Sequence, residues 1–235
     1  MSEVAIVIPT VNYYSERRVR CETSIAEHTP PIYDLVYQED TERRGFAHTC
    51  NRGIALALRL EPKYVLLLND DTVVTPGWLT AMLDVMTGVQ GCGLVGPMSD
   101  KVSGPQQGEP MAAPTATEVR RLVGLALLIR REVIEKIGGL DERFGLNFED
   151  DDFCLRALAA GYRLMIARHS FVRHEGSATF KELGLDYVGT LQAAWRVFAA
   201  KWGARLTETG GYQVDVPAWD RERCYVPLPA VEVAV

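Results

Sequence analysis

The sequence predicts an α/β fold in which helices flank a mostly parallel sheet. Strand patterns occupy residues 4–8, 34–38 and 64–68, the first and third suited to buried strands, and helical patterns at 15–27 and 48–60 separate them. This alternation places consecutive strands in parallel, joined by right-handed crossovers. The chain of 235 residues is 47% hydrophobic, which is enough to bury one large core. Folds of this class bind ligands at the carboxyl ends of their parallel strands.

Proline marks the ends of the early elements. Pro9 closes the first apolar run, the Pro-Pro pair at 30–31 stops the first helix, and Pro62 follows the second. Pro76 opens a further helix over residues 77–86, because proline is favourable in the first turn of a helix. The first half of the chain is therefore a regular alternation of strands and helices.

The second half of the chain is less regular. Its local patterns predict strands at residues 92–95, 124–129 and 162–167 and helices at residues 131–137, 150–160 and 181–202. Residues 99–118 hold glycine and proline without apolar periodicity, and we expect a structureless, mobile lid there. The Pro-rich tail after Gly203 supports no prediction of its elements.

Composition and charge argue against several classes of protein. The net charge of −6 disfavours passive binding to a polyanion. Five cysteines form no CxxC pair and are odd in number, which favours a reduced, cytoplasmic protein. No basic, apolar leader opens the chain, and the longest apolar stretch, residues 122–129, is far shorter than the ~20 residues of a spanning helix. We expect at most a peripheral contact with a membrane, through a partner.

Two adjacent carboxylates, Asp70 and Asp71, directly follow the predicted strand at 64–68 and lie between Asn69 and Thr72. Neighbouring carboxylates repel each other unless a positive group lies beside them, and a divalent cation with oxygen ligands relieves that repulsion. A turn that caps the following helix is the structural alternative. The position at the end of a parallel strand favours a ligand site.

A second acidic cluster, residues 149–152 (Glu-Asp-Asp-Asp), lies at the start of the predicted helix at 150–160. Acidic residues stabilise a helix N-terminus, and Asp152 can pair with Arg156 four residues later. One cap explains one or two carboxylates, so a general base positioned by the helix start accounts for the surplus. His174 follows a strand, where a structural role is the ordinary case, and it becomes a third metal ligand only if it meets the acidic clusters.

Other nucleotide and nucleophile motifs are absent or misplaced. Residues 91–96 match G-x-G-x-x-G, but this pattern spans a predicted strand and runs into Pro97 instead of opening a helix. No Walker A loop, nucleophile elbow or cysteine–histidine pairing is present. A nicotinamide or flavin cofactor is therefore disfavoured.

These clusters, in this order, resemble the inverting family-two glycosyltransferases of the GT-A fold, in particular the rhamnosyl- and galactofuranosyl-transferase-like members. The resemblance covers roughly residues 4–180, and the set of motifs is more specific than any single one. It rests on residues 4–10 (Val-Ala-Ile-Val-Ile-Pro-Thr), 38–40 (Gln-Glu-Asp), 45–47 (Gly-Phe-Ala) with 51–53 (Asn-Arg-Gly), 68–72 (Leu-Asn-Asp-Asp-Thr), 138–144 (Gly-Gly-Leu-Asp-Glu-Arg-Phe) and 148–150 (Phe-Glu-Asp).

The resemblance implies a role for each matching residue. Asp71 and His174 would hold a metal ion, Mn²⁺ or Mg²⁺, while Asn69 replaces the first acidic residue of a strict DxD motif. Asp150 would be the general base, with Glu149 and Asp151 on the acceptor side. Glu39 would take the place of the aspartate that reads the base in the family. The residues that would contact the nucleotide sugar are Pro9, Thr10, Asn12, Glu39, Asn51, Arg52, Asn69 and Asp70.

The implied enzyme is an inverting hexosyl- or deoxyhexosyl-transferase that moves one sugar from a UDP- or dTDP-sugar to an acceptor hydroxyl. A nucleoside diphosphate is anionic, so a site lined by carboxylates needs a divalent cation to bind it and to stabilise it as it leaves. Residues 1–203 would form one GT-A domain, with a nucleotide-sugar half at 1–97, an acceptor half at 98–203 and a separate tail at 204–235.

Several questions stay open at this point. The acceptor could be a glycan, a lipid-linked molecule, a protein or a modified nucleic acid, and the oligomeric state has no sequence signal. A non-catalytic nucleotide- or sugar-binding protein of the same fold is one alternative, but it has no need of a general base. A nucleotidyltransferase is another, although it should carry a Gly-rich loop near the N-terminus, and residues 9–14 contain no glycine.

Overall fold

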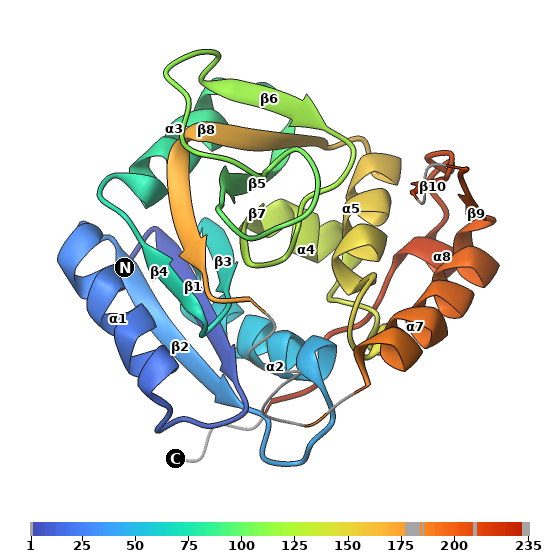
Figure 1. Ribbon diagram of the computed structural model, residues 1–235, viewed down its shortest axis with the longest axis horizontal. Helices are drawn as coiled ribbons and strands as arrows, with labels where there is room; N and C mark the ends of the chain where they lie inside the picture. The colour runs from blue at the N-terminus through green and yellow to red at the C-terminus, as the bar shows by residue number, and fades with distance from the viewer. Residues whose placement is uncertain (1, 177–183, 185, 209–210, 232–235) are drawn as a thin grey trace.

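A computed structural model of the chain describes residues 2–176, 184, 186–208 and 211–231 (Figure 1). A large sheet runs through it in the order β2-β1-β3-β7-β5-β8-β4, and β6 pairs with β8 beside this path. The strands are β1 (Val4–Thr10), β2 (Tyr33–Glu39), β3 (Tyr64–Leu68), β4 (Thr72–Val74), β5 (Cys92–Met98), β6 (Ala116–Val119), β7 (Ala126–Arg130) and β8 (Arg163–His174).

The strand directions confirm the predicted α/β class with a mostly parallel sheet. β1 is parallel to β2 and to β3, β5 is parallel to β8, and β7 runs antiparallel to both β3 and β5. Five strands of the main path, β2, β1, β3, β5 and β8, therefore point the same way, with β7 reversed between them. β8 is long: its first part pairs with β5, and its last residues pair antiparallel with the short β4, which was not predicted.

Helices cover both faces of the sheet. α1 and α3 pack on one face and α2, α4 and α5 on the other, as Figure 1 shows. The apolar run of β1 serves both faces, since Ala5 and Val7 contact one core while Val4, Ile6 and Ile8 contact the other. The helices are α1 (Glu16–His28), α2 (Phe46–Leu58), α3 (Trp78–Gly88), α4 (Arg131–Ile137), the 3-10 turn η1 (Glu142–Phe144), α5 (Glu149–Ala159), α7 (Tyr187–Trp202) and α8 (Arg221–Cys224).

Two predicted elements differ from the structure, and part of a third lies outside the described residues. Pro76 does not open a helix, because α3 begins at Trp78 behind Gly77, whose left-handed backbone (φ 76°) forms the cap. Residues 99–118 are not structureless: β6 begins at Ala116, and the buried Gln106 bonds the carbonyl of Pro97 (3.0 Å) and the amide of Val123 (2.7 Å). Of the helix predicted at 181–202, residues 181–183 and 185 lie outside the described part of the chain.

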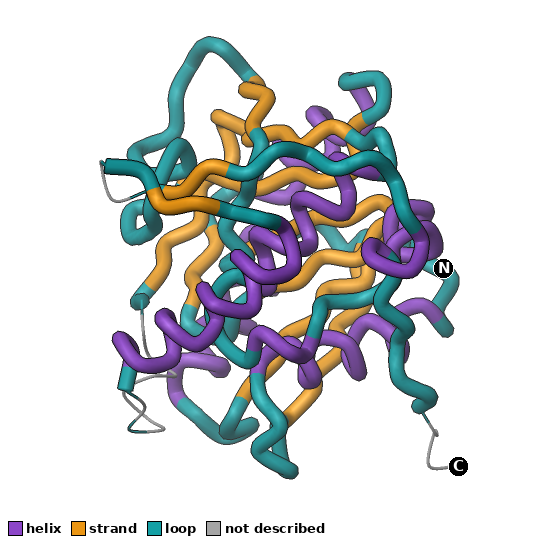
Figure 2. Tube along the Cα trace, turned by 90° about the vertical axis from the view of Figure 1, so that its right-hand side faces the viewer, coloured by secondary structure: helices purple, strands orange, loops and turns teal. Residues whose placement is uncertain are grey.

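The segment after α7 packs onto the domain. It contains the hairpin of β9 (Arg205–Leu206) and β10 (Tyr212–Gln213), followed by α8, and runs mostly as loop over the face that Figure 2 turns to the viewer. The Val226 amide donates to the carbonyl of Ile137 (3.0 Å), and the Gly139 amide donates to Val226 (2.8 Å). No helix in the described ranges has both the length and the apolar character needed to cross a bilayer.

Candidate active site

The end of β3 brings Asp70 against the end of β1 and the start of α1. Thr10 Oγ1 donates to Asp70 Oδ2 over 2.6 Å, and Arg17 Nε donates to Asp70 Oδ1 over 3.1 Å. Burial raises the pKa of Asp70, and the nearby Asp71 adds to the rise, while Thr10 and Arg17 act in the opposite direction. Asp70 is thus held in place by two donors from the carboxyl edge of β1 and the helix that follows it.

Asp71 faces His174, which lies 103 positions later in the chain. The β4–β8 pairing sets Thr72 opposite His174, so Asp71 Oδ1 lies 3.3 Å from His174 Nε2. His174 Nδ1 is 2.9 Å from the carbonyl oxygen of Lys101. A carbonyl only accepts, so in the neutral ring Nδ1 carries the proton and Nε2 presents its lone pair to Asp71.

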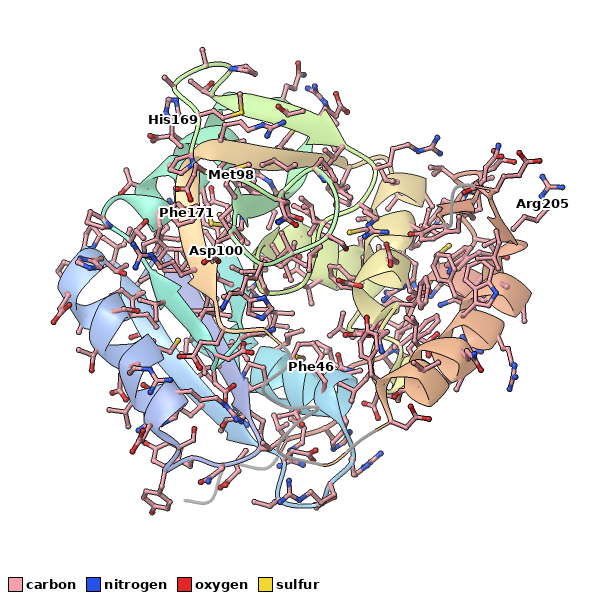
Figure 3. The ribbon with its side chains drawn as sticks, in the orientation of Figure 1. Phe46, Met98, Asp100, His169, Phe171 and Arg205 are labelled. Atoms are coloured by element: carbon pink, nitrogen blue, oxygen red, sulfur yellow. The ribbon has the colours of Figure 1, made fainter. Side chains whose placement is uncertain are left out.

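The loop after β5 completes the support of His174. Asp100 Oδ1 accepts the His174 backbone amide over 3.0 Å, and Figure 3 shows Asp100 beside β8. Burial opposes the charged form of the ring, but the Asp71 carboxylate outweighs it, so the pKa of His174 lies above its ordinary value. The predicted meeting of His174 with the first acidic cluster is therefore present in the fold.

The donor atoms at this point suit a divalent cation completed by phosphate oxygens. Asp71 Oδ1 is buried and accepts no hydrogen bond from any described residue. Together with His174 Nε2, 3.3 Å away, it offers one oxygen and one nitrogen. No group of three or more His, Cys, Asp or Glu side chains gathers as a metal site in the described ranges. Such a partial set matches Mg²⁺ and Mn²⁺, which commonly use one or two carboxylates plus substrate phosphates.

Asp150 lies in the first turn of α5 and is oriented by backbone amides. Its Oδ2 accepts from the Gly124 amide over 3.0 Å, and its Oδ1 accepts from the Asp151 amide over 2.8 Å. The next residue along from Gly124, Leu125, accepts the Asn69 amide over 2.9 Å. The turn before β7 therefore ties the second acidic cluster to the first. Burial raises the pKa of Asp150, although these amides oppose the shift.

The other carboxylates of the second cluster have distinct surroundings. Burial raises the pKa of Glu149 well above its ordinary value, and its Oε2 has no hydrogen-bond partner among the described residues. Asp151 Oδ1 accepts from the Tyr212 hydroxyl over 2.5 Å and lies 3.4 Å from Arg121 Nε. Asp152 is fully buried and pairs with Arg156 over 2.8 Å, as its spacing predicted. Asp152 is thus structural, while Glu149 and Asp151 remain beside Asp150.

Some of the predicted nucleotide contacts lie at the end of β1, and others line a small pocket nearby. Pro9, Thr10 and Asn12 follow one another at the end of β1, where Glu39 Oε1 accepts the Tyr13 amide over 3.1 Å. Glu39 and Arg52 line one small pocket of about 40 Å³ with residues 38, 40–42, 48 and 49. A larger open hollow lies at the amino ends of β1 and β2 and contains none of the predicted site residues.

Asn51 does not fit the role of a nucleotide contact. It is completely buried, and its side-chain amide bonds both backbone groups of Leu140, over 2.7 and 2.8 Å, and Glu142 over 3.1 Å. These bonds use the amide to hold residues 138–144 against α2. A Cβ on Gly139 would lie 2.3 Å from Asn51 Oδ1, which explains glycine there. Asn51 belongs to the segment on which the resemblance rests, but its hydrogen bonds give it a structural role in this fold.

The sequence analysis missed four groups that touch these carboxylates: Arg17, the Gly124 amide, Arg121 and Tyr212. Gly124 had a usable signal, because a glycine before a buried strand often allows close backbone approach, and a Cβ there would lie 3.4 Å from Asp150 Cβ. The other three carry no local pattern that separates them from surface residues. The G-x-G-x-x-G match runs along β5, and side chains of Tyr162 and Gln106 pack against its glycines.

Known structures share this architecture. The crystal structure of GalNAc-T7 with UDP, GalNAc and Mn²⁺ superposes with a TM-score of 0.64 at 12% identity, covering 86% of this chain and 48% of that one. Staphylococcus aureus TarS 1-349 in complex with UDP superposes with a TM-score of 0.57 at 16% identity, covering 84% and 71%. At such identities the likeness shows the fold alone, which is the GT-A fold of glycosyltransferases.

Sequence comparison identifies the family. Uncharacterised proteins of Mycobacterium bovis and Mycobacterium tuberculosis are 30% identical over 149 residues, which cover 59% of this chain and 56% of each relative. The chain thus spans about half the length of the curated relatives it matches. The family described as "Glycosyltransferase like family 2" matches residues 4–185, which is most of the chain. The chain belongs to this glycosyltransferase-like family 2.

Proposed function

We propose that the chain is a metal-dependent, inverting glycosyltransferase that moves one hexosyl or deoxyhexosyl group from a nucleoside diphosphate sugar to an acceptor hydroxyl. The observation that carries this proposal is the pair of Asp71 Oδ1 and His174 Nε2, 3.3 Å apart at the end of β3. The turn before β7 links this pair to Asp150 at the start of α5. Metal-dependent sugar transfer needs two parts: a pair of ligands for the cation and a positioned general base.

The residues at the ends of β1 and β3 would bind the donor. Asp71 and His174 would hold Mn²⁺ or Mg²⁺, which would neutralise the diphosphate and stabilise it as the leaving group. Asp70 is fixed by Thr10 and Arg17, so its carboxylate is placed to contact the ribose or to orient these donors toward the phosphates. Glu39 and Arg52 line the same small hollow, where they would contact one edge of the nucleoside of a UDP- or dTDP-sugar.

Asp150 would take the proton of the acceptor hydroxyl. Two backbone amides hold its carboxylate on a rigid helix start, which keeps the direction of proton transfer constant. Burial raises its pKa and so makes it a stronger base than an exposed aspartate. With Asp150 as the base and the acceptor oxygen as the attacking atom, the nucleoside diphosphate is displaced directly, which inverts the sugar carbon. Glu149 and Asp151 lie on the same helix turn, on the acceptor side.

Donor binding is the first test. In titration calorimetry with UDP and dTDP, we expect the wild type to bind a nucleotide tightly only when Mn²⁺ or Mg²⁺ is present. Asp71→Asn should bind the nucleotide weakly both with and without the metal. Asp84→Asn, an exposed change on α3, is the matched control and should bind as the wild type does. The metal site would be contradicted if the wild type bound nucleotide as tightly in EDTA as with the metal, or if Asp71→Asn bound it as tightly as the wild type does.

Turnover is the second test and separates an enzyme from a binding protein. A hydrolysis screen over UDP- and dTDP-sugars identifies a usable donor, and Asp150→Asn should then lower kcat by about 10²–10⁴-fold. Asparagine keeps an acceptor for the Gly124 amide but takes no proton, so metal-dependent nucleotide binding should be unchanged. Near wild-type kcat in Asp150→Asn would show that another group is the base, and binding without any turnover would favour a binding protein.

A further inference from the structure

The C-terminal hairpin reaches the second acidic cluster although it lies outside the family match, which ends at residue 185. We propose that Tyr212 is a positioning residue: with Arg121, its hydroxyl holds the Asp151 carboxylate beside Asp150 and so sets the proton affinity of Asp150. This inference rests on the proposed function of Asp150 as the general base. It assigns a task to the tail, which the motifs left without one.

The geometry of the hairpin delivers the Tyr212 hydroxyl. Tyr212 pairs with Leu206 across β9 and β10, while Arg205 of the same hairpin points away from the molecule in Figure 3. The Tyr212 ring packs against aromatic side chains at centroid distances of 5.1 Å (Phe198), 5.8 Å (Phe148) and 6.0 Å (Trp195). These contacts fix the ring independently of its hydroxyl, which leaves the hydroxyl free to serve Asp151.

A neutral hydrogen-bond donor and a positive charge converge on one oxygen of Asp151. The Tyr212 hydroxyl lies 2.5 Å from Asp151 Oδ1, and Arg121 Nε lies 3.4 Å from the same atom. Asp150 bonds the amide of Asp151 and the amide of Gly124, so the two carboxylates sit on adjacent residues with separate sets of donors. Asp151 is therefore placed to act on Asp150 through its charge without sharing its hydrogen bonds.

The electrostatic balance makes the Tyr212 bond consequential. Burial raises the pKa of Asp151 to about 7, and the charge of Asp150 contributes to the rise, while Arg121 and Tyr212 oppose it. Asp151 therefore changes charge near neutral pH. The charged or titratable groups that act on this pair are Glu149, Asp150, Asp152 and Cys154 on α5, Arg121 before β7, and Tyr212 on β10.

The charge of Asp151 changes the strength of the neighbouring base. Ionised Asp151 places a negative charge beside Asp150 and favours protonation of Asp150, whereas neutral Asp151 does not. The Tyr212 hydroxyl stabilises the ionised form, so it lowers the pH at which Asp150 becomes the stronger base. Because the groups interact, the pair titrates with two macroscopic values, and both need to be followed.

The test is a pH titration of aspartate side-chain carboxyl carbons by NMR in the full chain, which needs no knowledge of the donor. Asp150→Asn and Asp151→Asn assign the two signals. In Tyr212→Phe we expect the titration of Asp151 to move up by about one pH unit, since a hydrogen bond to a charged acceptor is lost. Tyr225→Phe, which removes a hydroxyl from the same tail and keeps the ring near Arg221, should leave both titrations unchanged.

Arg121→Met is a second, independent variant. It removes the cation that lowers the pKa of both Asp150 and Asp151, so the titrations of both carboxyls should move to higher pH. This variant tests the inference even if Tyr212→Phe does not fold. With a donor in hand, the inflection of kcat that belongs to Asp151 should move upward in Tyr212→Phe and disappear in Asp151→Asn. Unchanged titrations in both Tyr212→Phe and Arg121→Met would overturn the inference. Wild-type kcat in Asp150→Asn would instead overturn the proposed base, while the NMR result would stand.

Discussion

The buried ion cluster behind the second acidic motif should contribute strongly to stability. Asp152 and Arg156 are both completely buried, and Arg156 Nε lies 2.8 Å from Asp152 Oδ2. The other oxygen of Asp152 accepts from Lys201 Nζ over 2.6 Å and from Trp202 Nε1 over 2.8 Å. Asp152→Asn keeps the shape of the side chain and removes its charge, so two buried cations lose part of their compensation.

The structure allows the size of the effect to be worked out. Removal of one partner of a buried ion pair costs about 3–5 kcal/mol, because the remaining charge stays desolvated. Arg156 keeps the carbonyls of Ile137 (2.9 Å) and Gly139 (2.7 Å), and Lys201 keeps Asp141 (2.8 Å), so the lower end of that range applies. We therefore expect a loss of about 3 kcal/mol in the free energy of unfolding, or about 1 M in the urea midpoint.

The assay is urea unfolding followed by far-ultraviolet circular dichroism, with Glu135→Gln as the matched control. Glu135 pairs with Arg131 at the same i,i+4 spacing and the same 2.8 Å distance, but on an exposed part of α4. Its loss should cost no more than about 0.5 kcal/mol, since water screens an exposed pair. If Asp152→Asn costs less than about 1 kcal/mol, the reasoning from burial is refuted.

Two further predictions concern stability. Gly138→Ala should lower the free energy of unfolding by roughly 2–4 kcal/mol, because a Cβ there would lie 1.6 Å from the Val226 carbonyl at φ +75°. Gly77→Ala, at φ +76° in open space, should cost only about 1–2 kcal/mol, and equal midpoints in thermal unfolding would contradict the clash. Asp141 is buried, but donors that include Lys201 outweigh that effect and hold its pKa below the ordinary value. The ionised Asp141 carboxylate therefore stabilises the fold above about pH 4, and this stabilisation is lost as the pH falls. Between pH 5 and pH 2 the free energy of unfolding should fall less steeply in Asp141→Asn than in the wild type.

The sequence alone was sufficient for the fold class and for most elements. The apolar run of β1 and the polar helix that follows it are local signals, and Ser15 caps α1 by accepting the Arg18 amide. The Asp152–Arg156 pair follows from helical spacing alone. These features depend on residues within one or two turns of each other, so periodicity and capping encode them directly.

The site itself was predicted only as a set of separate motifs. Asp71 and His174 meet because β4 pairs with β8, and β4 is a three-residue strand with no distinctive pattern. Nothing in the local sequence separates an asparagine that reads a nucleotide from one that holds a backbone, and the bonds of Asn51 to Leu140 decided that question. Such contacts depend on strand register, which long-range packing sets.

The contacts between the family-matched domain and its C-terminal tail could not be predicted from the sequence. Tyr212 has no neighbour in sequence that marks it as functional, and only the packing of the hairpin against α7 brings its hydroxyl to Asp151. Likewise, Gly138 must be glycine because Val226, far along the chain, passes over it. Local sequence therefore determined which segments become strands and helices, whereas the tertiary structure decided which side chains share a site, because hydrogen bonds between distant segments exist only once those segments are packed together.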